Sequence, residues 1–307
     1  MTVRLRLFLI QRIKICKNVV SLNFKQKKMK KLFFIAVISV FALSSCCDKE
    51  KNIEKEVIIT KDSSDVSNSE YQVAATLWFQ KSAEARAIYY QTFSYAKLVL
   101  DDKLKKDRFK IKKKKPKAVI TDIDETVLNN SPYNARLIET GTHFDTKSWT
   151  KWVNEKRAEA LPGAVDFAHF VKEKGIEIFY ISNRSVKNLQ TTLENLQNAG
   201  FPFADKKHIL LKDKTSDKTI RRNIVLKDYD VILYLGDNLR DFDENFKYSK
   251  NMNRNDSVNM HSNLFGTNYI AFPNPMYGEW EKEAYKGHFS KTDAEKRKMR
   301  IDALDTN

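Results

Sequence analysis

Two aspartates stand directly behind an apolar run in the segment AVITDIDETVLNNSPY, residues 118–133. The run predicts a buried strand, and Asp122 and Asp124 lie at its end, where carboxylates are costly unless something pairs with them. Two carboxyl groups two positions apart can act as a nucleophile and a proton donor. Their oxygens are also the ligands that hard cations such as Mg²⁺ prefer. The segment is therefore a candidate catalytic or metal site.

Further polar residues follow two other apolar runs. Ser182 ends the run IEIFYIS, while Asp237 and Asp241 lie in GDNLRDF, at and just beyond the end of DVILYLGD. In parallel sheets ligands bind beyond the carboxyl ends of the strands, so we expect these side chains to converge in one crevice. Clustered carboxylates would repel one another and would also repel a phosphate. A bound Mg²⁺ would remove this conflict, because it takes oxygen ligands from a few carboxylates and from substrate phosphate.

The elements that must position these residues alternate along the chain. Apolar strands buried on both faces and separated by helices indicate an α/β fold with a parallel sheet. Upstream, residues 71–104 lack Gly and Pro and carry apolar side chains at three- and four-residue steps, which predicts amphipathic helices. The predicted strands cover residues 118–122, 176–182, 208–211, 230–237 and 267–272, and the predicted helices between them cover 163–173, 186–198 and 216–226.

Four short segments, in this order, carry a resemblance. DIDET (122–126), ISNR (181–184), KTSDKTIR (214–221) and GDNLRDF (236–242) are similar to the four motifs of the haloacid-dehalogenase-like (HAD) phosphatases. Over residues 70–305 the strings DETVLNNSPY, YLGDNLRDF and PNPMYGEWE resemble one family, the class C acid phosphatases, or lipoprotein e(P4)-like 5′-nucleotidases. This resemblance implies a HAD-like (Rossmannoid) domain over residues 70–307 with helices on both faces of its sheet. It also implies a mainly helical cap built from the N-terminal helices, the insertion at about 128–162 and the C-terminal segment.

The resemblance also implies roles for the motif residues. Asp122 would attack phosphorus to form an aspartyl-phosphate, and Asp124 would be the general acid and base. Thr126, Ser182 and Lys218 would bind the phosphate, with Lys214 left open as an alternative to Lys218. Mg²⁺ would be held by Asp122, the backbone carbonyl of Asp124, and Asp237, with Asp241 oriented behind them.

Substrate contacts are expected outside the sheet. Trp149 and Tyr277 match aromatic positions that flank the nucleobase in the resembling family, and a stacked ring tolerates any base. Asn183 and Arg184 are either substrate contacts or a loop cap, whereas Trp152 is expected to be packing. The implied activity is hydrolysis of nucleoside 5′-monophosphates and similar phosphomonoesters. The alternative is a non-catalytic surface lipoprotein that binds a ligand such as haem.

The N-terminus has the layout of an export signal. Met29 and two lysines precede LFFIAVISVFAL, residues 32–43, which is short for a membrane span, and LSSC follows, ending at Cys46. LSSC resembles a bacterial lipobox, so residues 1–45 would be a signal region, with Met29 as the alternative start. Cys46 would be lipidated and residues 46–69 would be a tether. This predicts a lipid-anchored protein of the bacterial cell envelope, at the outer membrane or facing the periplasm.

Composition excludes several other classes. The net charge of +16 falls to +6 without residues 1–45, which hold ten of the 55 basic residues and none of the 39 acidic ones. We therefore expect no nucleic-acid partner. The five histidines show no metal-ligand spacing, so neither a histidine phosphatase nor a zinc site is expected. With Cys46 lipidated, the chain would form no disulfide framework. A homodimer is left open.

Overall fold

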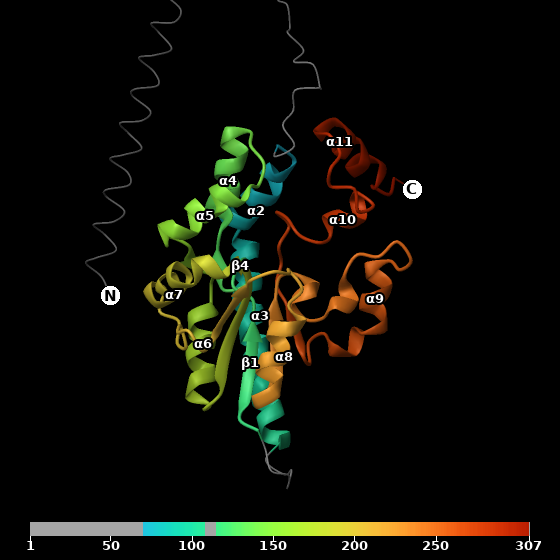
Figure 1. The fold of residues 1–307 in the computed structure, drawn as a ribbon. Helices are drawn as coiled ribbons and strands as arrows, with labels where there is room; N and C mark the ends of the chain where they lie inside the picture. The colour runs from blue at the N-terminus through green and yellow to red at the C-terminus, as the bar shows by residue number, and fades with distance from the viewer. Residues whose placement is uncertain (1–69, 108–114, 307) are drawn as a thin grey trace, which may run out of the picture. The chain divides into compact units, whose positions relative to one another are not determined.

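The computed structural model describes residues 70–107 and 115–306. A five-stranded sheet forms its centre, with the order β5-β4-β1-β6-β7 and every neighbouring pair parallel (Figure 1). Each strand lies within a few residues of its predicted range. The strands are β1 (Lys117–Thr121), β4 (Glu177–Ser185), β5 (Ile209–Lys212), β6 (Asp230–Gly236) and β7 (Tyr269–Ala271).

The central strand β1 shows how the sequence builds two core layers. Successive side chains of a strand point to opposite faces of the sheet. Val119 accordingly packs in the larger core, while Ala118 and Ile120 pack with Val225 in the smaller one. All four residues are at most 3% exposed, so an all-apolar run fits a strand that is covered on both sides.

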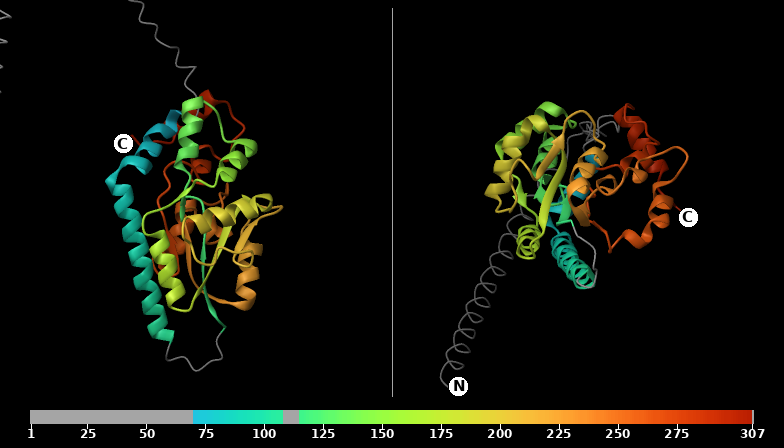
Figure 2. Two further views of the ribbon diagram at one scale, coloured as in Figure 1. Left: turned by 90° about the vertical axis from the view of Figure 1, so that its left-hand side faces the viewer. Right: turned by 60° about the horizontal axis from the view of Figure 1, so that its bottom comes forward.

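Helices cover both faces, as predicted. α3 and α6 contact each other and pack on one face, whereas α8 packs against β4 and β6 on the other (Figures 1 and 2). The helices of the sheet domain and its flanks are α3 (Ala83–Asp107), α6 (Ala164–Glu173), η2 (Val186–Asn188), α7 (Leu189–Asn198), α8 (Thr219–Asp228), η3 (Leu239–Asp241), η4 (Glu244–Phe246), α9 (Arg254–Met260) and η5 (Ser262–Leu264).

The insertion forms a separate layer above the carboxyl ends of the strands (Figure 1). Two short strands, β2 (Leu128–Asn129) and β3 (Glu159–Ala160), pair antiparallel and close it off at its base. Between them lie α4 (Ser131–Thr140) and α5 (Thr146–Glu155). α4 has a proline in its first turn and ends at Gly141 with φ +61, the usual signals for a helix start and stop. The remaining helices near this layer are η1 (Glu70–Gln72), α2 (Val73–Lys81), α10 (Glu281–Ala284) and α11 (Asp293–Asp302).

The N-terminal helices, which we expected to help build the cap, divide between two layers. η1 and α2 pack on α4. α3 instead lies along the sheet, where Phe93, Ala96 and Leu100 enter the main core. Its apolar stripe therefore covers a sheet face and not the cap.

The described residues contain no helix that is both long and apolar enough to cross a membrane. The predicted signal region, the lipidation site Cys46 and the tether lie outside the described residues.

Candidate active site

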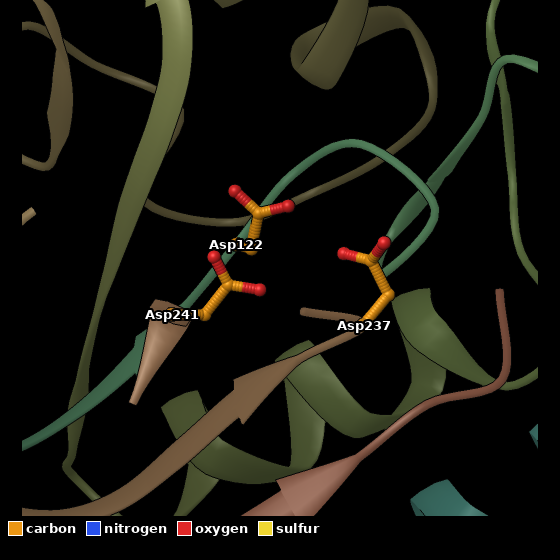
Figure 3. Close-up of side chains that lie close together, drawn as sticks. All are labelled: Asp122, Asp237 and Asp241. Atoms are coloured by element: carbon orange, nitrogen blue, oxygen red, sulfur yellow. The ribbon is translucent and has the colours of Figure 1, made fainter. Parts of the chain in front are cut away.

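Three aspartates meet at the carboxyl edge of the sheet. Asp122 follows β1, Asp237 follows β6, and Asp241 ends the short helix η3. One carboxylate oxygen from each lies within 4.8 Å of the others, and Figure 3 shows the three side chains directed toward a common space. The backbone N–H of Asp122 donates to the carbonyl of Leu235 at 2.9 Å, which ties the two strand ends together. The sequence-based expectation that these acids converge is thus met in their placement.

Burial and crowding disfavour the charged forms of Asp122 and Asp237. Burial is the main cause that raises the pKa of Asp122 well above its usual value, and Asp241 and Asp237 add to it against the opposing charge of Lys218. Burial and the charge of Asp241 likewise raise the pKa of Asp237 to about 7, although a hydrogen bond from Asn274 opposes the shift. A cluster of acids with raised pKa values is the arrangement that a bound cation relieves.

Lys218 lies inside this cluster. It stands at the N-cap of α8, is 4% exposed, and its Nζ lies 2.5 Å from Asp122 Oδ1 and 2.7 Å from Asp241 Oδ1. Burial lowers the pKa of Lys218, but the two carboxylates outweigh it, so the pKa lies above its ordinary value. Lys214 is exposed and has no such position. Of the two lysines left open by the sequence, the structure therefore brings Lys218 to the aspartates.

The donor set suits a hard divalent cation. The cluster holds three carboxylates and one ammonium group, which contacts two of them, so negative charge is in excess, and the three carboxylates offer oxygen ligands, as Mg²⁺ prefers. The side chain of Asp124 is not part of this cluster, so this residue could ligate only through its backbone, as the resemblance implied. Residues Asp122, Asp237 and Asp241 would hold the ion.

Asp124 is held beside the cluster by side-chain donors. Arg184 Nη2 lies 2.7 Å from its Oδ1, and the Oγ of Ser182 donates to its Oδ2 at 3.1 Å. Ser182 also lines the cavity described below, as does Asp124. Asn183 is exposed at the cavity, and its Oδ1 accepts from Arg221 at 2.7 Å.

Thr126 requires a correction. We expected its hydroxyl to bind phosphate, but the residue is fully buried and its Oγ1 donates to Asp237 Oδ1 at 3.2 Å. Thr126 is not among the residues that line the cavity. Its hydroxyl therefore positions a metal-ligand candidate, because the loop after β1 turns this side chain toward β6.

A cavity of about 650 Å³ opens from the aspartates toward the insertion and the C-terminal segment. Trp149 and Tyr277 both line it, together with Tyr133 and Phe144. The Trp149 ring packs edge-on against Tyr133, with centroids 5.1 Å apart. Asp122 and Lys218 lie at the same cavity, so the predicted base-stacking rings and the predicted nucleophile share one space. Trp152, expected to be packing, is 2% exposed.

Sequence reasoning missed several supporting residues. Glu125 is fully buried with φ +59, a conformation rare outside glycine, and its carboxylate accepts from the hydroxyl of Tyr277. Asn274 donates to Asp237 Oδ2 at 2.9 Å, and Arg222 donates to the carbonyl of Asp241 at 3.2 Å. Glu125 and Asn274 lie in segments that resemble the family and Arg222 directly follows one, which is the available signal. Their partners depend on loop geometry that a sequence does not show.

Comparison with known proteins agrees with this geometry. Residues 33–280 match the model of the HAD superfamily, subfamily IIIB (acid phosphatase). The class C acid phosphatase from Bacillus anthracis, solved with tungstate bound, is 43% identical and superposes with a TM-score of 0.73. The superposition covers 79% of this chain and 100% of that chain. A second structure of the Bacillus anthracis class C acid phosphatase is 42% identical with the same TM-score and coverage.

Curated relatives are more distant. Acid phosphatase 1 of Solanum lycopersicum is 31% identical over 169 residues, which is 52% of this chain and 57% of that protein. Vegetative storage protein 1 of Arabidopsis thaliana is 32% identical over 135 residues, covering 41% of this chain and 48% of that protein. The chain thus spans about half the length of these curated relatives. With four fifths of its residues matched by the family model, the chain belongs to the acid phosphatases of HAD subfamily IIIB.

Proposed function

We propose that the chain is a magnesium-dependent phosphomonoesterase that acts on nucleoside 5′-monophosphates and similar esters. The observation that carries the proposal is the position of Asp122, which lies at the cavity, within a carboxylate cluster and in contact with Lys218. A second carboxylate, Asp124, lines the same cavity two residues further along the chain. Family membership alone is weaker support, since the relatives include a protein named for storage.

The chain's own residues account for a two-step transfer. Asp122 attacks phosphorus, and the bond from phosphorus to the leaving alkoxide breaks as Asp124 gives that oxygen a proton. Water then attacks the aspartyl-phosphate while Asp124 takes its proton, which releases inorganic phosphate and restores Asp122. Phosphoryl transfer depends mainly on positioning and neutralising the three equatorial oxygens, for which Ser182 and Lys218 supply donors. A bound Mg²⁺ would add positive charge at the same oxygens.

A cavity with aromatic walls supports nucleotides as substrates. Trp149 and Tyr277 line the same cavity as Asp122. Stacking of a base on aromatic rings is worth about 1–3 kcal/mol per base. That binding energy comes from a part of the substrate that does not react, and it favours esters that carry a base.

The LSSC segment ending at Cys46 supports a lipid anchor in the cell envelope, which we include in the proposal.

Hydrolysis of AMP and of p-nitrophenyl phosphate tests the proposed activity. With Mg²⁺ both esters should be hydrolysed, EDTA should abolish turnover, and added Mg²⁺ should restore it. Unchanged rates in EDTA would contradict the metal requirement. No turnover of either ester with Mg²⁺ would favour a ligand-binding lipoprotein.

The substrate class is tested by Trp149→Ala and Tyr277→Ala. Each should lower kcat/KM for AMP by about 10-fold or more, while p-nitrophenyl phosphate changes much less. Equal losses on the two esters would show that the rings are structural and that the enzyme is an unspecific phosphatase.

A further inference from the structure

We infer that Arg184 is a positioning residue for the proton donor: it anchors one oxygen of Asp124 by short contacts and leaves the other, which has only longer contacts, to face the leaving group. This inference rests on the proposed phosphatase activity. The sequence left open whether Arg184 is a substrate contact or a loop cap; in the structure it lines the cavity and its guanidinium is paired with Asp124.

The two oxygens of Asp124 are held very differently. Oδ1 accepts from Arg184 Nη2 at 2.7 Å, from Arg184 Nε at 2.9 Å and from Asn130 Nδ2 at 2.8 Å. Oδ2 has only the longer contacts, 3.1 Å to Ser182 Oγ and 3.2 Å to Arg184 Nε. Charge-assisted hydrogen bonds of a guanidinium to a carboxylate are short and fix its orientation. Oδ2 is therefore the oxygen that can give up its contacts and transfer a proton to the leaving group.

Arg184 is buried behind Asp124. Its side chain has no exposed surface, whereas that of Asp124 is 16% exposed. Arg184 is among the residues that line the cavity, and its guanidinium is paired with Asp124 there. Its remaining contacts are Thr192 Oγ1 at 3.5 Å, Asn130 Oδ1 at 3.3 Å and, at 5.8 Å, the ring centroid of Trp149, which lines the cavity.

The anchor joins the sheet to the insertion. Arg184 and Ser182 lie on β4, whereas Asn130 stands at the start of α4 and its Oδ1 accepts from Trp152 Nε1 at 2.8 Å. Asn130 and Trp152 are both buried, so the network is a fixed part of the core. Asp124 is thus held at the junction of the two layers, above the cluster that contains Asp122.

The proton balance follows from this assignment. In the first step the proton leaves Asp124 Oδ2 for the alkoxide oxygen as its bond to phosphorus breaks. The carboxylate that remains is stabilised by Arg184 through Oδ1. In the second step the same Oδ2 takes a proton from the attacking water, and Asp124 is again ready to donate.

Leaving-group dependence distinguishes this role from a structural one. A poor leaving group such as the ribose alkoxide of AMP needs the proton, whereas p-nitrophenolate leaves without it. Arg184→Met should lower kcat/KM, which reports the first step alone, by about 10²-fold for AMP, the lower end of what positioned proton transfer contributes, and by less than about 10-fold for p-nitrophenyl phosphate. In an Asp124→Asn background the same change should cost AMP hydrolysis little more, because the group that it positions is already inactive.

Arg221→Met is the matched control. Arg221 is also a buried arginine, and it holds the β4 end through the Ser182 carbonyl at 2.5 Å without touching Asp124, so its loss should slow both esters by the same factor. If Arg184→Met does not fold, as judged by thermal unfolding, Arg184→Lys is measured in its place. This variant keeps the charge but loses the paired contact with Asp124, so it should still slow the hydrolysis of AMP selectively.

The inference would be overturned if the Arg184 variants lost equal activity on AMP and p-nitrophenyl phosphate, or if their effect were fully additive with that of Asp124→Asn. The proposed activity would still stand in either case, because it depends on turnover by the wild-type protein. A wild-type protein that hydrolyses neither ester would overturn both.

Discussion

At the level of single residues, Lys218 is the basic residue held by two of the clustered carboxylates. Its ammonium group contacts both Asp122 and Asp241, so it offsets part of the repulsion among the carboxylates and stands where phosphate oxygens would gather. Lys214 lies four residues earlier in the same motif but is exposed. The two lysines therefore form a natural pair for mutation.

Lys218→Met should reduce kcat/KM for p-nitrophenyl phosphate by about 10²-fold or more, the cost of removing one donor aimed at transition-state charge. Lys214→Met should leave it unchanged. Assays with saturating Mg²⁺ and a thermal unfolding curve for each variant separate lost catalysis from lost folding. A strong effect of Lys214→Met with a weak effect of Lys218→Met would reverse the assignment.

At the level of elements, the amino end of β4 is tied to its neighbours by a charged cluster away from the active site. Glu177 accepts from Lys207 at 2.6 Å, contacts His208 Nε2 at 2.7 Å and accepts from the Tyr229 hydroxyl at 2.8 Å. Partial burial raises the pKa of Glu177, but these hydrogen bonds outweigh it and lower the pKa to about 2. An unperturbed glutamate titrates near pH 4.3.

The sign of the effect on stability follows from this lowered pKa. Glu177 contributes stability fully above about pH 4.3, and the contribution is lost as the pH falls from there toward 2. Glu177→Gln should therefore lower the free energy of unfolding at pH 7 by about 1 kcal/mol. The effect is small because Glu177 and Lys207 are partly exposed to solvent. Urea unfolding at pH 7 and pH 3 measures it, with Glu173→Gln on the exposed end of α6 as control. A difference from wild type that does not shrink at pH 3 would contradict the assigned pKa.

The sheet was predictable from the sequence because its strands are apolar on both faces and are separated by amphipathic helices. The convergence of Asp122, Asp237 and Asp241 then follows from parallel strands that end at one edge. The role of Thr126 could not be predicted, since the loop turns at Glu125, with φ +59, and directs the threonine hydroxyl to Asp237. The ion pair between Arg184 and Asp124 joins positions 60 residues apart and depends on where the insertion places Asn130.

At the level of the whole molecule, the basic N-terminal 45 residues are the part that sets the proposed location. They hold the apolar run 32–43 and are followed by Cys46, the last residue of LSSC, which resembles a lipobox. If Cys46 carries the lipid, then Cys46→Ala should move the protein from the membrane fraction to the soluble fraction.

Cys47→Ala is the matched control for that change and should leave the protein in the membrane fraction. Immunoblots of membrane and soluble fractions measure both variants. A Cys46→Ala protein that still sediments with membranes would contradict the lipid anchor.

The most direct test of the proposed mechanism is to trap the phosphorylated enzyme. The magnesium-loaded protein is mixed with radiolabelled AMP that carries the label in its phosphate, quenched rapidly in acid, digested, and the labelled peptide is sequenced. Attack by the first motif aspartate predicts an acyl-phosphate on Asp122 that hydroxylamine releases. Turnover of AMP without any protein-bound phosphate, or with the phosphate on another residue, would contradict this account.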